Sequence, residues 1–135
     1  MTSKFYDCKI LLSFDWMDGM LTYKDDFKRG VTELMVLHML LQADRYGYEI
    51  THAFEEKTDG NYTMAEGTLY PILYKLEDGD FISSYSVKVG VRRTRKFYHL
   101  EDAGRQRYEA MLRDYLRITQ DVFRILELEK NSDAQ

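Results

Sequence analysis

The sequence predicts a mainly α-helical fold with one small β-hairpin, which is an α+β arrangement. Three observations lead to this prediction. Apolar residues recur at helical spacing between residues 31 and 76, two strand-like segments flank Gly90, and a long segment after residue 101 lacks proline. The chain has 135 residues, of which 44% are hydrophobic, so we expect one domain with a single core.

Two helices are predicted between residues 31 and 61. Residues 31–42 are apolar at most positions, which indicates a helix that is buried on most sides and ends near residues 43–45. A second, short helix should follow Gly47 and be stopped by residues 58–61. Its inward-facing residues are Ile50, Ala53 and Phe54.

A third helix is indicated after Thr63. Thr63 and Glu66 have the spacing of a capping box, in which the Thr63 hydroxyl caps the helix and the Glu66 carboxylate returns to the Thr63 amide. Pro71 conflicts with a regular helix because it removes a hydrogen bond and crowds the preceding turn, so the residues alone predict a kink or a break. The inward stripe consists of Leu69, Ile72, Leu73 and Leu76.

The outward side of this helix carries two phenols one turn apart, beside a lysine. Such a face suits contacts with sugar, phosphate and base edges, although Tyr70 and Tyr74 would also fit packing against another part of the same protein. The outward residues are Glu66, Gly67, Tyr70, Pro71, Tyr74 and Lys75.

Residues 81–87 and 94–100 are rich in aromatic and branched side chains and predict two strands around Gly90. Alternation in the second strand places Arg95 and Phe97 on one face, and Lys96 and Tyr98 on the other.

The positive charge of the chain is concentrated in this hairpin. The net charge is −4, yet residues 85–98 hold five basic residues and no acid, while the remainder holds 14 basic and 23 acidic residues. Because salt screens charges beyond about 10 Å, a phosphate beside the hairpin responds mainly to the local positive charge. A helix that can enter a groove and a cationic hairpin are the two parts of a winged-helix DNA-binding domain, although a basic hairpin can also be ordinary solvated surface.

Residues 102–129 contain no proline and predict a helix about 40 Å long, with Gly104 as its weak point. Its apolar stripe exceeds what one small domain can cover. A symmetric partner would bury the stripe and separate two DNA-reading helices by about 34–36 Å, although the helix could instead fold back over its own domain. The predicted dimer interface consists of Tyr108, Met111, Leu112, Tyr115, Thr119, Val122 and Leu126.

Residues 1–26 form an extension in which an added helix is predicted, although Asp18 and Gly19 interrupt the pattern and Met17 or Met20 is an alternative start. No apolar run approaches the roughly 18 residues of a membrane span, and a single cysteine, Cys8, fits a reducing compartment, so we expect a cytoplasmic protein. The three histidines lie far apart, so neither a metal nor another cofactor is expected.

Several motifs occur together in a characteristic order and spacing. They are Gly30 with Leu34 and Leu37, Tyr46-Gly47-Tyr48-Glu49-Ile50, Gly67-Thr68-Leu69-Tyr70-Pro71-Ile72-Leu73, Leu76-Glu77, and Arg95-Lys96-Phe97-Tyr98-His99-Leu100 with Gly104. From about Phe27 to the C-terminus the chain thereby resembles the PadR family of winged-helix transcriptional regulators, in its branch with a short C-terminal part.

The resemblance implies that the third helix continues through Pro71 as the recognition helix and that the hairpin is the wing. It also implies a homodimer that represses transcription until a small effector binds. By the same resemblance, Trp16, Tyr108 and Tyr115 could line a cavity for a flat aromatic effector, although ordinary packing explains these rings equally well.

We therefore expect a winged helix-turn-helix domain at residues 27–100, a dimerisation helix at 101–129 and a disordered tail at 130–135. The alternative is a winged-helix module that binds a protein instead of DNA. An enzyme is least favoured because no nucleophile, base and orienting group cluster in the sequence. The expected DNA contacts are Tyr46, Tyr48, Thr68, Tyr70, Tyr74, Lys75, Arg92, Arg93 and Arg95.

Overall fold

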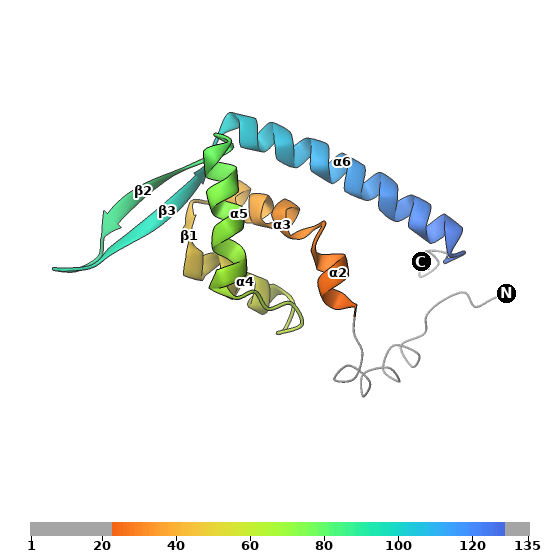
Figure 1. The fold of residues 1–135 in the computed structure, drawn as a ribbon, viewed down its shortest axis with the longest axis horizontal. Coiled ribbons are helices and arrows are strands. Elements are labelled where there is room, and N and C mark those ends of the chain that lie inside the picture. The colour runs from red at the N-terminus through yellow and green to blue at the C-terminus, as the bar shows by residue number, and fades with distance from the viewer. Residues whose placement is uncertain (1–22, 129–135) are drawn as a thin grey trace. The chain divides into compact units, whose positions relative to one another are not determined.

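The structure is a computed structural model that describes residues 23–128 (Figure 1). The described chain divides into two compact units, one from Thr32 to Leu112 and the other containing the described residues before Thr32 and after Leu112. The elements are α2 (Lys24–Lys28), α3 (Thr32–Gln42), β1 (Arg45–Tyr46), α4 (Gly47–Lys57), α5 (Glu66–Asp78), β2 (Ile82–Lys88), β3 (Thr94–Leu100) and α6 (Asp102–Ile125).

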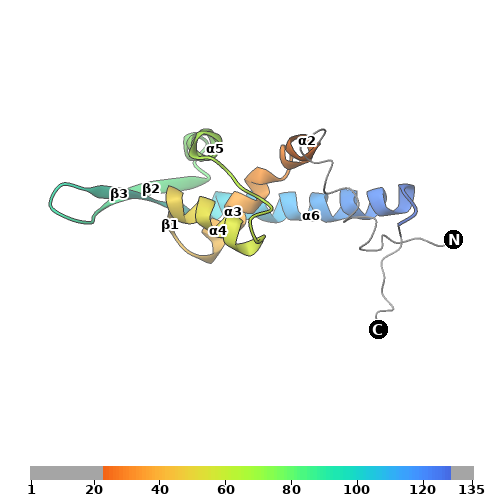
Figure 2. The ribbon, with the colours of Figure 1, turned by 90° about the horizontal axis from the view of Figure 1, so that it is seen from below.

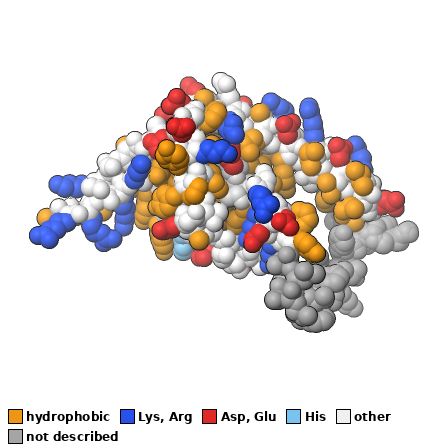
Figure 3. Space-filling view, in the orientation of Figure 1, with side chains coloured by type: hydrophobic (Ala, Val, Ile, Leu, Met, Phe, Trp, Pro, Cys, Tyr) orange, Lys and Arg blue, Asp and Glu red, His pale blue; other side chains and the backbone are white. Residues whose placement is uncertain are grey.

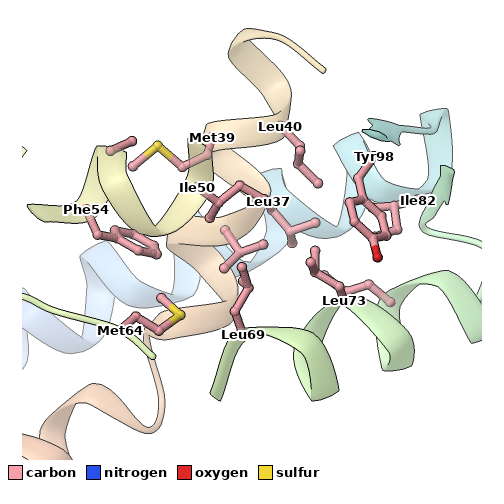
Figure 4. Close-up of a cluster of buried hydrophobic side chains, with 13 residues drawn as sticks. Leu37, Met39, Leu40, Ile50, Phe54, Met64, Leu69, Leu73, Ile82 and Tyr98 are labelled. Atoms are coloured by element: carbon pink, nitrogen blue, oxygen red, sulfur yellow. The ribbon is translucent and has the colours of Figure 1, made fainter. Parts of the chain in front are cut away.

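The hydrophobic core of the Thr32–Leu112 unit forms around α3 (Figure 4). As predicted, α3 is buried on most sides, because its apolar residues leave only a narrow polar edge. Each large apolar side chain in this core stabilises the fold by about 1.5–3 kcal/mol. The most deeply buried are Val36, Leu37, Ile50, Leu69, Leu73 and Ile82, which come from α3, α4, α5 and β2.

The sheet is antiparallel with the strand order β1-β3-β2. The predicted hairpin is confirmed, with Ile82 opposite Leu100 at its base and Lys88 opposite Thr94 near its tip. Strand β1 was not predicted. Its two residues are too short for a period-two pattern, and they are extended because they pair with Tyr98 and Phe97 of β3.

The capping box predicted at Thr63 is wrong. Helix α5 begins at Glu66, its N-cap is Ala65, and no side chain caps it. Met64 is 8% exposed and belongs to the core, so the segment before the helix stays extended to insert this side chain. The carboxylate half of a capping box occurs at α4 instead, where Glu49 Oε1 accepts a hydrogen bond of 3.2 Å from the amide of the N-cap residue, Tyr46.

The residues alone predicted a kink or a break at Pro71. A break is wrong, because α5 runs through Pro71 as the family resemblance implied. Pro71 removes one hydrogen bond to the carbonyl of Gly67, a residue that is exposed, so water can satisfy that carbonyl. Leu69 and Leu73 are fully buried on either side of Pro71, and their packing holds the helix together.

Helix α6 begins at Asp102, as predicted, and ends at Ile125. Its end is fixed by Glu127, which has a φ of 59°, and by a 2.8 Å hydrogen bond from the Leu128 amide to the Phe123 carbonyl. Two contacts hold its first turns to α3: Tyr108 Oη lies 2.8 Å from His38 Nδ1, and Arg107 Nε donates to Glu33 Oε2 at 2.5 Å. Residues 1–22 of the predicted extension, Trp16 among them, and the tail at 130–135 lie outside the described residues.

Candidate nucleic-acid interface

The outward face of α5 is exposed, as predicted. Leu69, Leu73 and Leu76 face the core, so the residues between them point to solvent. Tyr74 is 73% exposed and Tyr70 is 42% exposed. The other exposed residues of this face are Glu66, Gly67, Thr68, Pro71 and Lys75.

Tyr70 differs from Tyr74 because its hydroxyl end lies against Gly47, the first residue of α4. A Cβ atom at Gly47 would be 2.4 Å from Tyr70 Oη, which is closer than real atoms approach. Partial burial, followed by the charge of Glu66, raises the pKa of Tyr70 above that of a free phenol. Tyr70 therefore packs along the start of α4, while its remaining surface is available to a ligand.

The junction of β1 and α4 places Tyr46 and Tyr48 next to the wing. Their rings stack with centroids 6.4 Å apart, and the Tyr46 ring meets Phe97 of β3 edge-on at 5.3 Å. The guanidinium carbon of Arg95 lies 4.6 Å from the centre of the Tyr46 ring. Three of the predicted contact residues thus form one cluster.

The alternation predicted for β3 is present and gives the wing two different faces. Arg95 and Phe97 share a face with Tyr46. Lys96 and Tyr98 lie on the face next to α5, where Lys96 Nζ is 3.9 Å from Glu77 Oε1 and 5.7 Å from the centre of the Tyr98 ring. Lys96 was not among the predicted contacts, and the alternation of β3 alone does not reveal its pairing with Glu77.

The tip of the wing is basic and exposed, and Figure 3 shows Lys and Arg side chains gathered along it. Within residues 23–128, no carboxylate forms an ion pair with Lys88, Arg92 or Arg93. Their charges are therefore free to attract an anion, which in an exposed array of this kind is most simply a phosphate. Figures 1 and 2 show the β2–β3 hairpin extending away from α3, α4 and α5.

The predicted dimer residues of α6 fall into two groups. Tyr108 and Met111 pack partly against the core of their own chain, and Leu112 is half-buried. Further along, Tyr115, Val122 and Leu126 are about half exposed, and Thr119 lies between them. Leu116 and Phe123 are also exposed and widen the apolar surface beyond the predicted stripe.

Within the described part of the chain, no three His, Cys, Asp or Glu residues gather in a way that could hold a metal ion. None of the helices in residues 23–128 is long and apolar enough to cross a membrane.

The helices α3, α4 and α5 followed by the β2–β3 hairpin define a winged helix-turn-helix domain of the DNA-binding class. The chain belongs to the PadR-like family of transcriptional regulators, whose family model matches residues 36–110. Members of this family are transcriptional regulators and not enzymes.

Individual relatives agree with this assignment. A transcriptional regulator of Mycobacterium tuberculosis is 35% identical over 81 residues, which cover 59% of this chain and 71% of that protein. The negative transcriptional regulator PadR of Bacillus subtilis is 32% identical over 76 residues, or 56% of this chain and 42% of that protein. The chain therefore matches less than half the length of the Bacillus protein.

Solved structures share the fold. A transcriptional regulator from Clostridium thermocellum superposes with a TM-score of 0.68 at 30% identity, covering 78% of this chain and 99% of that chain. Bacillus subtilis PadR, solved in complex with operator DNA, superposes with a TM-score of 0.57 at 30% identity, covering 61% of this chain and 47% of that chain.

Proposed function

We propose that this protein is a homodimeric, sequence-specific DNA-binding repressor that a small-molecule effector releases from its operator. One observation carries the DNA-binding part of the proposal. Tyr70 of α5 lies against Gly47, Gly47 is flanked by Tyr46 and Tyr48, and Tyr46 holds Arg95 of the wing. These contacts make the exposed face of α5, the start of α4 and the wing neighbours in one surface.

Each part of this surface has a distinct role in the proposal. Thr68, Tyr70, Tyr74 and Lys75 of α5 would meet base edges and sugars in the major groove. Tyr46 and Tyr48, at the start of α4, would contact the sugar-phosphate backbone of the DNA. Arg92, Arg93 and Arg95 would contact the phosphates that flank the groove.

The dependence of binding on salt tests this proposal. The duplex is the one recovered by selecting random fragments with the purified protein, and a two-fold symmetric site is expected. With about three phosphate contacts per subunit, log affinity should fall against log salt concentration with a slope near −5. The double variant Arg92→Ala/Arg93→Ala should flatten this slope by about 3–4 because the dimer loses four contacts.

The matched control removes two positive charges elsewhere. Lys57→Ala/Arg105→Ala changes the net charge equally at exposed positions of α4 and α6. It should leave the slope close to that of the wild type. Equal slopes for the wild type and the wing variant would remove the wing from the mechanism.

The homodimer is supported by the exposed apolar residues of α6, since a second copy of the helix would cover them. Repression is supported by the similarity to the Bacillus protein named as a negative regulator. A reporter gene placed behind the selected operator should be silenced by the wild type. Increased expression would make the protein an activator.

The effector part can be tested through the single tryptophan of the chain, Trp16. A planar aromatic compound that stacks with Trp16, Tyr108 or Tyr115 should quench the fluorescence of Trp16, and it should weaken operator binding over the same concentration range. Variants Tyr108→Leu and Tyr115→Leu should raise the compound concentration that is needed. Quenching without a change in operator affinity would separate this binding from regulation.

A second function is favoured by apolar exposure on the wing. Val91 is 91% exposed, and Val87 and Val89 are each more than one third exposed. A winged-helix module that binds a protein could cover these valines. It would show no shift of a duplex at physiological salt, and Val91→Ser would then release a specific protein partner.

A further inference from the structure

Asp44 lies in the turn between α3 and β1 and binds both arms of the wing with one carboxylate. Its Oδ2 accepts a 2.7 Å hydrogen bond from the Tyr85 hydroxyl of β2. Its Oδ1 lies 2.8 Å from Nδ1 of His99 on β3. A single side chain therefore ties β2 and β3 to the segment that leads into β1.

This contact lies on the face of the sheet that carries Tyr46. Tyr85 is opposite Phe97, Tyr46 is opposite Phe97 on the other side, and residues opposite each other project to the same face. The Tyr85 and Phe97 rings stack with centroids 5.7 Å apart. Contacts thus run continuously from Asp44 through Tyr85, Phe97 and Tyr46 to Arg95.

The other face of the wing has its own anchor. Glu77 of α5 accepts a 2.5 Å hydrogen bond from Ser84 of β2 through Oε2, and its Oε1 lies 3.9 Å from Lys96 of β3. The base of the hairpin is therefore held by one carboxylate on each face, Glu77 toward α5 and Asp44 toward β1. Two opposed anchors fix the angle of a hairpin better than one.

The charges around His99 strengthen its contact with Asp44. The hydrogen bond to Asp44 raises the pKa of His99, partial burial opposes this, and the charges of Asp44, Glu101 and Asp102 raise it further. These acids come from the α3–β1 turn, the β3–α6 junction and the first turn of α6. The hydrogen bond from Tyr85 lowers the pKa of Asp44, burial opposes this, and His99 lowers it further.

We propose that Asp44 is a positioning residue for operator binding, because its contacts with Tyr85 and His99 set the angle of the wing relative to α4 and α5. This inference rests on the proposed DNA-binding function. The tip lies about seven residues, or roughly 23 Å, beyond His99 along β3. A rotation of about 10° at the base would move Arg92 and Arg93 by about 4 Å, which exceeds the length of a phosphate hydrogen bond.

The first experiment measures the contact in the free protein. Nuclear magnetic resonance titration should give His99 a pKa above that of a free histidine. Asp44→Asn should lower this pKa because the charged partner is lost. Tyr85→Phe keeps the carboxylate and should leave the pKa of His99 raised. A pKa for His99 that is the same in the wild type and in Asp44→Asn would contradict the contact.

The second experiment measures affinity for the selected operator near pH 6. Asp44→Asn removes a negative charge next to a DNA-binding wing, so simple electrostatics predicts tighter binding. Loss of positioning predicts the opposite, a weakening of about 5- to 10-fold, which is the size of one ordinary hydrogen bond in the whole complex. Tyr85→Phe, which changes no charge, should weaken binding in the same direction.

The control is Asp78→Asn, which removes an acid from an exposed position at the end of α5. It should bind as tightly as the wild type or slightly more tightly. Circular dichroism establishes that each variant is folded at the assay temperature. If Asp44→Asn behaves like Asp78→Asn, Asp44 has no positioning role.

The dependence on pH separates positioning from charge. In the wild type, operator affinity should fall as pH rises through the pKa of His99, because the positive partner of Asp44 is lost. Asp44→Asn keeps His99, which still becomes positively charged at low pH. If this charge alone strengthened operator binding, the pH dependence of affinity would therefore persist in Asp44→Asn. Under the proposal the pH dependence is reduced equally in Asp44→Asn, in His99→Gln and in the double variant.

Two kinds of failure can be distinguished. If the wild type selects no duplex, the proposed function fails and the inference fails with it, whatever the titration of His99 shows. If the wild type binds its operator and Asp44→Asn binds it equally well across the pH range, the proposed function stands and only the inference is overturned.

Discussion

Replacement of Gly104 by alanine should destabilise the protein, although rules for isolated helices predict the reverse. Gly104 lies in the first turn of α6, and exchange of glycine for alanine within a helix stabilises it by about 1 kcal/mol. Gly104 is buried, however, and a Cβ atom there would lie 2.6 Å from Leu100 Cδ1 and 2.2 Å from the carbonyl oxygen of Phe81. The Phe81 oxygen belongs to the backbone and cannot rotate away.

The size of the effect follows from what must move. The Phe81 carbonyl also accepts a 3.0 Å hydrogen bond from the Glu101 amide, which fixes the start of α6. The new methyl group needs about 1 Å more room, and overpacking of this kind typically costs about 1–3 kcal/mol. Loss of the hydrogen bond would add about 1 kcal/mol. After the helix propensity gain is subtracted, we expect a net loss of about 2 kcal/mol.

Urea and thermal unfolding at one fixed protein concentration measure this change, since the stability of a dimer depends on concentration. The melting temperature of Gly104→Ala should fall by about 6–10 °C. Gly67→Ala is the matched control in the first turn of α5, where nothing lies within 4 Å of an added Cβ atom. It should be neutral or more stable by up to about 1 kcal/mol. A Gly104→Ala variant as stable as Gly67→Ala would refute the close approach.

Three further predictions concern the interface, the dimer and pH. Gly47→Ala should displace Tyr70, whose ring is free to move outward, and should weaken operator binding in a mobility-shift assay. The free energy of unfolding should change by less than about 1 kcal/mol, and loss of folding would contradict the prediction. Leu112→Glu should convert the proposed homodimer to monomers in light scattering, whereas Arg113→Glu on the polar side of α6 should not. A dimeric Leu112→Glu would place the interface elsewhere. The loss of unfolding free energy in Asp44→Asn should be greatest between about pH 4 and pH 6.5. Because the pKa of His99 is raised, its interaction with Asp44 stabilises the fold fully below about pH 6.5, and because the pKa of Asp44 is lowered, the same interaction needs a pH above about 4. A loss independent of pH would exclude the ion pair.

The features that sequence patterns predicted correctly share a physical cause. The apolar periods of α3, α4, α5 and the hairpin reflect which side of each element faces the core, and that requirement is written into consecutive residues. The basic wing was predictable for a similar reason, since its charge lies in one short segment. The arrangement of Arg95 and Lys96 on opposite faces followed from the pleat of a strand.

The features that local rules predicted wrongly depend on distant partners. Thr63 and Glu66 match a capping box, yet Met64 between them belongs to the core, and its burial outweighs a cap worth about 1 kcal/mol. Pro71 should break a helix, yet the buried leucines on either side of it keep α5 continuous. Strand β1 forms only because β3 lies beside it.

The sequence by itself determined the class of fold, the order of the helices α3 to α6 and of the two strands of the wing, and the charge of the wing, because each of these depends on residues close together in the chain. Only the tertiary structure decided that Tyr70 lies against Gly47, that Arg95 stacks on Tyr46, and that Asp44 binds Tyr85 and His99. These pairs are separated by 23 to 55 positions in the sequence. No local pattern encodes them, since they arise only when the packing of the core brings α4, α5 and the wing together.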